Sequence, residues 1–392
     1  MNIILFDGRS RNDLLPFTFT RPVAEIRIGI LTIREKWEKM LPSTYSYLTQ
    51  EYLQERFPMV ESDDNLFVAG NILPTCELIK TIQQLQTNET LLYGEEMVAF
   101  RGNKNDFEKG TIFKSIQFEH KLQFIRKGYD IFTFNGVALE ADFRLLTSGR
   151  QSAKLSSTVQ IIGETHFADG TPKLFVVEGV TAECATINLK NGPVYLGKEV
   201  EIMEGVHIRA PFAACEHAVV NMGAKIYGAT TLGPYCKVGG ELNNVVLFGY
   251  SNKAHDGFLG NSVIGEWCNI GAGTESSNLK NDYSEVKLWN YPESKFLKTG
   301  LQFCGLMMGD YSKVGINTMF NTATTVGVGC NIYGSEFPRV YVPCFQEGGA
   351  AGFKSANMSR FFTTLATVKA RRGLQLSDEE KRACETILTF EV

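Results

Sequence analysis

Apolar residues recur at every sixth position through the middle of the chain. From residue 196 the step of six meets eight apolar residues in unbroken register: Leu196, Ile202, Ile208, Ala214, Val220, Ile226, Leu232 and Val238. After a shift at 241–244 the same step continues through Val246, Asn252, Phe258, Ile264 and Ile270, and it returns as Met308, Val314, Phe320, Val326 and Ile332. A period of six is the pattern of a hexapeptide parallel β-helix, in which stacked coils bury an aliphatic column. Eight consecutive matches disfavour an ordinary β-sandwich with chance spacing.

The residues before and after this repeat follow other patterns. Residues 1–150 read as an α/β domain, with a buried strand at 2–6, a helix over 23–41 and further apolar runs at 65–70 and 90–94. Residues 355–392 read as helical, and Ser377 with Glu380 forms a capping-box pattern. We therefore expect an α/β domain at 1–150, an all-β helix at 151–353 and a short helical extension at 354–392.

Composition excludes several classes of partner. The chain of 392 residues has 39 basic and 43 acidic side chains, and it contains no run of Lys or Arg. This balance predicts binding neither to nucleic acid nor to a membrane surface. The first apolar run is too short for a signal peptide, which favours a cytoplasmic protein. Nine scattered cysteines without C-x-x-C spacing indicate reduced, mostly buried thiols and no metal site.

The stretch "HDGFLGNSVIGEWCNIGAGTESSNLKNDYSEVKL" at 255–288 carries a family resemblance. It is similar to the acetyltransferase segment of bifunctional enzymes that join N-acetylglucosamine-1-phosphate uridylyltransferase to glucosamine-1-phosphate N-acetyltransferase, most closely in their archaeal-type and variant bacterial branch. The resemblance implies a Rossmann-like nucleotidyltransferase domain, a left-handed β-helix and a homotrimer. It also implies acetyl-CoA as co-substrate, an amino-sugar 1-phosphate as acceptor, and a place in nucleotide-sugar biosynthesis for the cell envelope.

The same resemblance assigns roles to residues of the β-helix. His255 matches the family's catalytic His, and a His side chain titrates near neutrality and can accept a proton from the attacking amine. Ala272, between Gly271 and Gly273, matches the position whose main chain meets the acetyl thioester, where an amide stabilises an oxyanion. The resemblance places substrate contacts at Lys253, Phe258, Asn278 and Lys287, the last as a phosphate-binding cation.

Two positions of this segment depart from the family pattern. Phe258 stands where the family has a Tyr, so a hydroxyl contact to the sugar is absent. Ser284 stands where the archaeal-type enzymes have a second phosphate-binding Lys. Lys280, Lys295 or Lys298 would supply the missing charge, and for each of them a solvated loop position is at least as good an interpretation. The acceptor could therefore differ from glucosamine 1-phosphate.

The N-terminal loop departs further from the family. Gly8 and Arg11 match nucleotide-binding positions, but Val23 replaces an expected phosphate-binding Lys, whose charge Arg21 or Arg27 would supply. Asn71 replaces an Asp that would bind Mg²⁺, and a neutral amide is a poor lone ligand for a hard cation. Mg²⁺ is expected only if this domain is active.

Three functions remain open from the sequence. The first is N-acetyl transfer by a chain whose nucleotidyltransferase-like domain is degenerate. The second is nucleotidyl transfer from UTP or dTTP as the main or second reaction. The third is a non-catalytic subunit that binds sugar nucleotide and regulates a partner enzyme.

Overall fold

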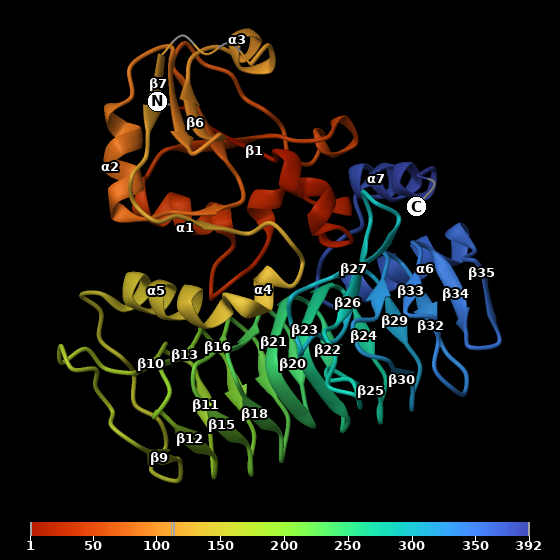
Figure 1. The fold of residues 1–392 in the computed structure, drawn as a ribbon. Coiled ribbons are helices and arrows are strands. Elements are labelled where there is room, and N and C mark those ends of the chain that lie inside the picture. Colours follow the sequence, from red (N-terminus) through yellow and green to blue (C-terminus); the bar gives the residue numbers. More distant parts are fainter. Residues whose placement is uncertain (1, 111, 113, 391–392) are drawn as a thin grey trace.

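The computed structural model describes residues 2–110, 112 and 114–390. An α/β domain lies above a long parallel β-helix, and two helices near the C-terminus pack beside the last coils (Figure 1). The expected fold class is therefore confirmed. Six of the nine cysteines are buried and all nine are free thiols.

The N-terminal domain is built on a six-stranded sheet of order β2-β1-β3-β6-β5-β7. Strand β1 is parallel to both of its neighbours, whereas β6 runs antiparallel to β3 and β5. The strands are β1 (Asn2–Phe6), β2 (Thr44–Leu48), β3 (Asn65–Ala69), β5 (Glu89–Tyr93), β6 (Glu96–Arg101) and β7 (Lys114–Gln117), with a separate pair β4 (Ile72–Leu73) and β8 (Gln123–Phe124). The expected strands at 2–6, 65–70 and 90–94 are thus present.

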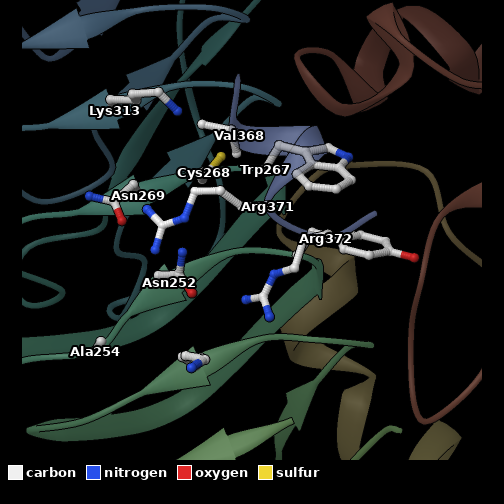
Figure 2. Close-up of a pocket in the computed structure, with 11 residues that line it drawn as sticks. Asn252, Ala254, Trp267, Cys268, Asn269, Lys313, Val368, Arg371 and Arg372 are labelled. Atoms are coloured by element: carbon white, nitrogen blue, oxygen red, sulfur yellow. The ribbon is translucent and has the colours of Figure 1, made fainter. Parts of the chain in front are cut away.

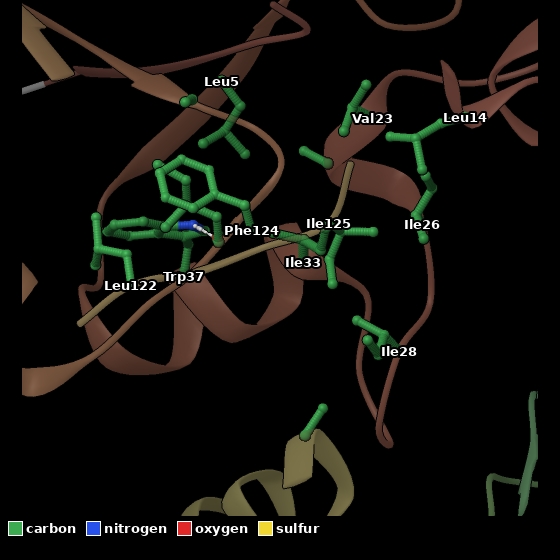
Figure 3. Close-up of a cluster of buried hydrophobic side chains, with 14 of the residues drawn as sticks. Leu5, Leu14, Val23, Ile26, Ile28, Ile33, Trp37, Leu122, Phe124 and Ile125 are labelled. Carbon is green, nitrogen blue, oxygen red and sulfur yellow. Dashed lines mark hydrogen bonds between the residues drawn. The ribbon is translucent and has the colours of Figure 1, made fainter. Parts of the chain in front are cut away.

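Helices cover this sheet and complete its core. They are α1 (Ile33–Met40), α2 (Cys76–Gln84) and α3 (Lys104–Glu108), with four short 3-10 helices, η1 (Arg9–Leu14), η2 (Phe17–Phe19), η3 (Val23–Glu25) and η4 (Glu51–Leu53). Figure 3 shows the apolar cluster, in which Trp37 lies beside Leu122 and Phe124. The Trp37 indole donates a hydrogen bond to the Ile72 carbonyl at 3.1 Å, so its polar atom is satisfied in the core.

The helix expected over 23–41 begins only at Ile33, so its first half was wrong. Gly29 adopts a φ of 71°, and a Cβ there would lie 2.7 Å from the Ala138 backbone. Thr32 starts α1 instead, in a reciprocal capping box with Glu35. A left-handed residue in close contact with another helix interrupts the apolar period that predicted a longer helix.

The β-helix has three faces, each a ladder of parallel strands. The first face contains β9 (Gln160–Ile162), β12 (Thr186–Asn188), β15 (His207–Arg209), β18 (Lys225–Tyr227), the start of β21 (Glu241–Gly249) and of β23 (Phe258–Glu266), then β25 (Glu275–Ser276) and β30 (Met319–Phe320). The second contains β10 (Leu174–Val176), β13 (Val194–Leu196), β16 (Phe212–Ala214), β19 (Thr230–Leu232), the ends of β21 and β23, β28 (Met307–Met308), β31 (Thr325–Val326) and β33 (Tyr341–Val342). The third contains β11 (Thr181–Ala182), β14 (Glu201–Ile202), β17 (Val219–Val220), β20 (Lys237–Val238), β22 (Asn252–Lys253), β24 (Asn269–Ile270), β29 (Lys313–Val314), β32 (Asn331–Ile332) and β34 (Gln346–Gly349), which turns back into β35 (Gly352–Ser355).

The six-residue register is correct up to Val238 and is wrong by one residue over the next coil. The strand partners of Leu232 and Val238 are Leu247 and Lys253, and the partner of Leu242 is Leu259. The interior therefore takes Leu247, Lys253 and Leu259 in place of the expected Val246, Asn252 and Phe258. Strands β21 and β23 run continuously across two faces, so the corner between these faces loses one residue and the step becomes five.

A ladder of aromatic rings marks the corner between the second and third faces. His217, Tyr235, Tyr250 and Trp267 occupy the same corner of successive coils, each with a φ between 54° and 60°. Their ring centroids are 4.5, 5.2 and 4.2 Å apart along the ladder, and neighbouring rings are nearly parallel. This stacking adds contacts outside the aliphatic column.

Helices and a hairpin join the two parts of the chain. α4 (Asp130–Thr133) and α5 (Asn135–Thr147) lie along the second face, and α6 (Met358–Ala370) and α7 (Asp378–Leu388) lie beside the last coils (Figure 1). Ser377 caps α7 by accepting a hydrogen bond from the Glu380 N–H, which is half of the expected capping box. The Glu380 carboxylate does not complete the box and instead accepts hydrogen bonds from Tyr311 and Lys369. The hairpin of β26 (Lys287–Asn290) and β27 (Lys295–Lys298) contacts the N-terminal domain, because the Asn290 amide donates to Asp13 at 2.8 Å.

Candidate functional site

His255 lies at the corner between the third and first faces, after β22 and before β23. Hydrogen bonds from neighbouring coils hold the backbone of this corner. The Asn221 amide donates to the Ala254 carbonyl at 2.7 Å, and the Gly273 N–H donates to the Asp256 carbonyl at 2.9 Å. The imidazole is exposed, and it forms no hydrogen bond with another residue that the structure describes. A fixed main chain therefore presents a free imidazole to solvent.

Gly257 is required for this corner to stack. Its φ is 121°, and a Cβ at this position would collide with the Thr274 carbonyl of the next coil. The Glu241 N–H donates to the Gly257 carbonyl at 3.1 Å, which fixes the corner to the coil on its other side. The Asp-Gly step beside His255 thus has a structural cause in the close approach of two backbones.

Lys253 lies inside the β-helix, below the His255 corner. Its side chain is 1% exposed, in the column that holds Val238 and Ile270. Its ammonium group donates to the His255 carbonyl at 2.5 Å. Burial lowers the pKa of Lys253 to about 8, against the opposing effects of Glu275 and Asp256. The structure therefore places this predicted substrate-binding residue behind the corner, in contact with its backbone.

The lowered pKa of Lys253 makes the stability of the protein depend on pH. The folded-state pKa is about 8, whereas unfolded Lys titrates near 10.4, at roughly its ordinary value. As pH rises through this interval the unfolded state holds more protons, so stability increases. We expect the melting temperature of the wild type relative to Lys253→Met to rise between about pH 7 and about pH 9.5.

Calorimetry at the two pH values measures this change. Lys190→Met is the matched control, because Lys190 is exposed and makes no ion pair with a described residue. The control difference should not vary with pH. A pH-independent difference for Lys253→Met would contradict the buried charge.

Ala272 lies one coil from His255, because Gly273 bonds to Asp256 in the stacked corner. Adjacent strands of a sheet are about 4.8 Å apart. The Ala272 carbonyl accepts a hydrogen bond from the Asn317 N–H at 2.7 Å, while no described residue accepts one from the Ala272 N–H. Gly271 stacks closely on the coil beyond it, where a Cβ would lie 2.6 Å from the Ile316 nitrogen. The Ala272 N–H is thus one of several amide donors of these stacked corners, near His255, for which no described residue is an acceptor.

The structure brings Phe258 and Asn278 together on the first face. A Cβ built on Gly260 would lie 2.6 Å both from the Asn278 amide nitrogen and from the Phe258 ring, so the two side chains border the same point. The Asn278 amide donates to the Asn261 side chain at 2.7 Å. Both are half-buried on the face that begins at the His255 corner.

Lys287 is the first residue of β26, in the hairpin that follows Asn278 in the sequence. It is exposed and makes no ion pair with a described residue. Three other lysines are candidate substitutes for the family's second phosphate-binding Lys, and each of them contacts a Glu residue of the same segment. Lys295 lies 2.9 Å from Glu293, Lys298 lies 3.4 Å from Glu285, and Lys280 donates to the Glu285 carbonyl at 3.1 Å. Carboxylates of the hairpin therefore neutralise two of the three.

The N-terminal loop is folded inward as a series of 3-10 turns. Gly8 is exposed with a φ of 61°, but Arg11 is only 4% exposed and donates to the Tyr52 hydroxyl at 2.9 Å. Arg21 is 5% exposed, bonds to Asp310 and lies 3.4 Å from Glu266. Burial alone lowers the pKa of Arg21, but these two carboxylates outweigh it and raise the pKa above its ordinary value. Both guanidinium groups are thus committed to internal contacts.

The residues at the edge of this sheet do not fit a Mg²⁺ ion. Asp7 accepts hydrogen bonds from the Val23 N–H and the Thr49 hydroxyl, at 2.7 and 2.5 Å, and lies 3.3 Å from Arg11. The Asn71 amide donates to Ser10 at 2.9 Å. No group of three or more His, Cys, Asp or Glu side chains able to hold a metal occurs among residues 2–110, 112 and 114–390.

A basic cleft between the third face and α6 is a feature that sequence reasoning missed (Figure 2). It has a volume of about 500 Å³, and Ala254, next to His255, lines it. Its cations are Lys237, Lys313, Arg371 and Arg372. The Arg371-Arg372 pair at the end of the predicted helix was a visible signal, but the sequence does not place it beside two lysines far apart in the chain.

Comparison with known proteins gives relatives of this chain. Residues 3–151 match the family described as sugar nucleotidyl transferase. A bifunctional sugar-1-phosphate nucleotidylyltransferase/acetyltransferase of Sulfurisphaera tokodaii is 29% identical over 144 residues, 36% of this chain and 35% of that protein. The predicted resemblance to the bifunctional GlmU-like family is confirmed, at modest identity.

Two further relatives have the name bifunctional protein GlmU. The protein from Methanocaldococcus jannaschii is 32% identical over 23% of this chain and 21% of its own length. The protein from Trichormus variabilis is 23% identical over 59% of this chain and 44% of its own length. The matched segments thus span less than half of each relative. Within the described part of this chain, every helix is too short or too polar to cross a membrane.

Proposed function

We propose that this chain is an acetyl-CoA-dependent N-acetyltransferase that acts on an amino-sugar 1-phosphate of the glucosamine 1-phosphate type. The observation that carries this proposal is the free imidazole of His255 one coil from the free N–H of Ala272. The names of the relatives, which include acetyltransferase, support it. The enzyme acts in cytoplasmic nucleotide-sugar biosynthesis, as a homotrimer.

The proposed roles follow from the chemistry of acyl transfer. The amine of the sugar attacks the thioester carbonyl, and His255 accepts the proton that the amine loses. The Ala272 N–H donates to the oxyanion that develops as the C–N bond forms. The C–S bond then breaks, and the protonated imidazole returns its proton to the leaving thiolate. Phe258 and Asn278 border the acceptor, with Lys287 as a further phosphate contact.

The direct test is acetyl transfer from acetyl-CoA to glucosamine 1-phosphate. Mass spectrometry of the acetylated sugar measures the product without interference from the protein's own thiols. Light scattering on the same preparation measures whether the active species is a trimer. Absence of product from a folded protein, with other amino-sugar phosphates also tested, would contradict the proposal.

Nucleotidyl transfer is the second candidate, because residues 3–151 match a sugar nucleotidyl transferase family. The buried Arg11 and Arg21, and a sheet edge that does not fit Mg²⁺, argue against it. We expect little or no pyrophosphate release from UTP or dTTP with N-acetylglucosamine 1-phosphate and Mg²⁺. A turnover in the range of about 1 to 10³ s⁻¹ would refute the degenerate domain. Ligand binding with no turnover in either assay would instead favour a regulatory subunit.

A further inference from the structure

The basic cleft is formed by parts of the chain that are far apart in sequence. Lys237 lies on β20 and Lys313 on β29, both on the outer surface of the third face, and Arg371 and Arg372 follow the end of α6. Figure 2 shows the Arg371 side chain extending over the strands that carry Asn252 and Asn269. Ala254 joins the floor of the cleft to the His255 corner.

The charge of this cleft is not balanced by the protein. No Asp or Glu lines it, and none of its four cations forms an ion pair with a described residue. Lys295 and Lys298 of the hairpin, in contrast, lie beside Glu293 and Glu285. An uncompensated cluster of cations in a concave site favours an anionic ligand.

Two polar groups of the cleft are partly removed from water and have no partner among the residues that the structure describes. Desolvation lowers the pKa of Lys313, and only the Cys268 thiol opposes this effect. The side-chain oxygen of Asn252 is buried and has no hydrogen-bond partner. A ligand with both anionic oxygens and a hydroxyl donor would satisfy the cations and this acceptor together.

We propose that the cleft binds a phosphate group of a substrate of the acetyl-transfer reaction, through Lys313 and Arg371. This inference rests on the proposed function. Arg371 offers a planar fork of donors for two phosphate oxygens, and Lys313 offers a half-buried point charge. Both proposed substrates carry phosphate, since coenzyme A has a pyrophosphate and the acceptor has a sugar phosphate.

Two variants of the full-length protein test this site. Lys313→Met removes the half-buried charge, and Arg371→Gln removes an exposed one with little risk to folding. Arg372 is less suitable, because it donates to the Tyr235 carbonyl at 3.3 Å and supports the coil. Arg339→Gln is the matched control, because Arg339 is exposed, unpaired among the described residues and outside the cleft.

Calorimetric titration with coenzyme A, glucosamine 1-phosphate and inorganic pyrophosphate measures the effect. We expect each cleft variant to weaken the binding of pyrophosphate and of one substrate by about tenfold, since each loses a charge-assisted hydrogen bond. The control should keep wild-type affinity. Loss confined to coenzyme A would assign the cleft to the coenzyme, and loss confined to glucosamine 1-phosphate would assign it to the acceptor.

Binding is measured without turnover, so the two proposals fail separately. Wild-type affinity for all three probes in Arg371→Gln and in folded Lys313→Met would overturn the phosphate site, even if acetyl transfer is observed. Failure of the wild type to bind any of the probes would overturn it as well. Cleft-dependent binding without acetyl transfer would support the site and contradict the proposed function.

Discussion

Replacement of His255 with alanine is expected to lower acetyl transfer at least a hundredfold while the melting temperature stays near that of the wild type. A general base contributes roughly 10²- to 10⁴-fold to the rate. The imidazole is exposed and makes no hydrogen bond with a described residue, so its removal costs the fold little. Steady-state kinetics with acetyl-CoA and glucosamine 1-phosphate, together with calorimetry, measure both quantities.

His207→Ala is the matched control for this experiment. His207 is an exposed His on β15 of the same β-helix, three coils before the predicted catalytic segment. Its loss should leave turnover unchanged. Wild-type turnover in His255→Ala would show that another group accepts the proton, and a large fall in melting temperature would show a structural role.

Arg21→Met is expected to lower the free energy of unfolding by about 3 kcal/mol. Removal of one member of a buried ion pair costs roughly 3–5 kcal/mol, because the other charge stays buried without its partner. The low end applies here because Asp310, 1% exposed, keeps hydrogen bonds from the Thr20 hydroxyl at 2.6 Å and the Glu266 N–H at 2.8 Å. Denaturant unfolding of the full chain measures the change.

Two further variants test whether the loss of stability in Arg21→Met comes from the buried ion pair with Asp310. Arg9→Met changes an exposed arginine of the same loop and should alter stability by less than about 0.5 kcal/mol. Adding Asp310→Asn to Arg21→Met removes the stranded charge and should restore part of the loss. The Asp310→Asn single variant completes the cycle. If the double variant loses more stability than the two single variants together, Arg21 and Asp310 do not stabilise each other as a buried pair.

The repeat predicted the β-helix because burial of one column leaves a periodic mark in the sequence. The period no longer gives the inward positions where a polar residue points inward, as at Lys253, and where a corner is one residue shorter, as before Leu247. An apolar period cannot detect an inward lysine, whose burial is made tolerable by a hydrogen bond to the His255 carbonyl. The first half of the helix predicted over 23–41 is also not helical, and the sequence does not show why. Only the contact of Gly29 with Ala138 explains why the chain turns there.

The sequence by itself determined the order of the α/β domain, β-helix and terminal helices, because local pattern carries that information. The resemblance to the family singled out His255, Ala272 and Asn278, whose roles stay predictions. Tertiary structure alone decided which charges face solvent and which are paired. Arg21 looks like a phosphate ligand in the loop, yet it bonds to Asp310, 289 residues away. The basic cleft likewise exists only where coils of the third face meet α6. The free energy of a buried charge depends on its partners, and these partners come from distant parts of the chain.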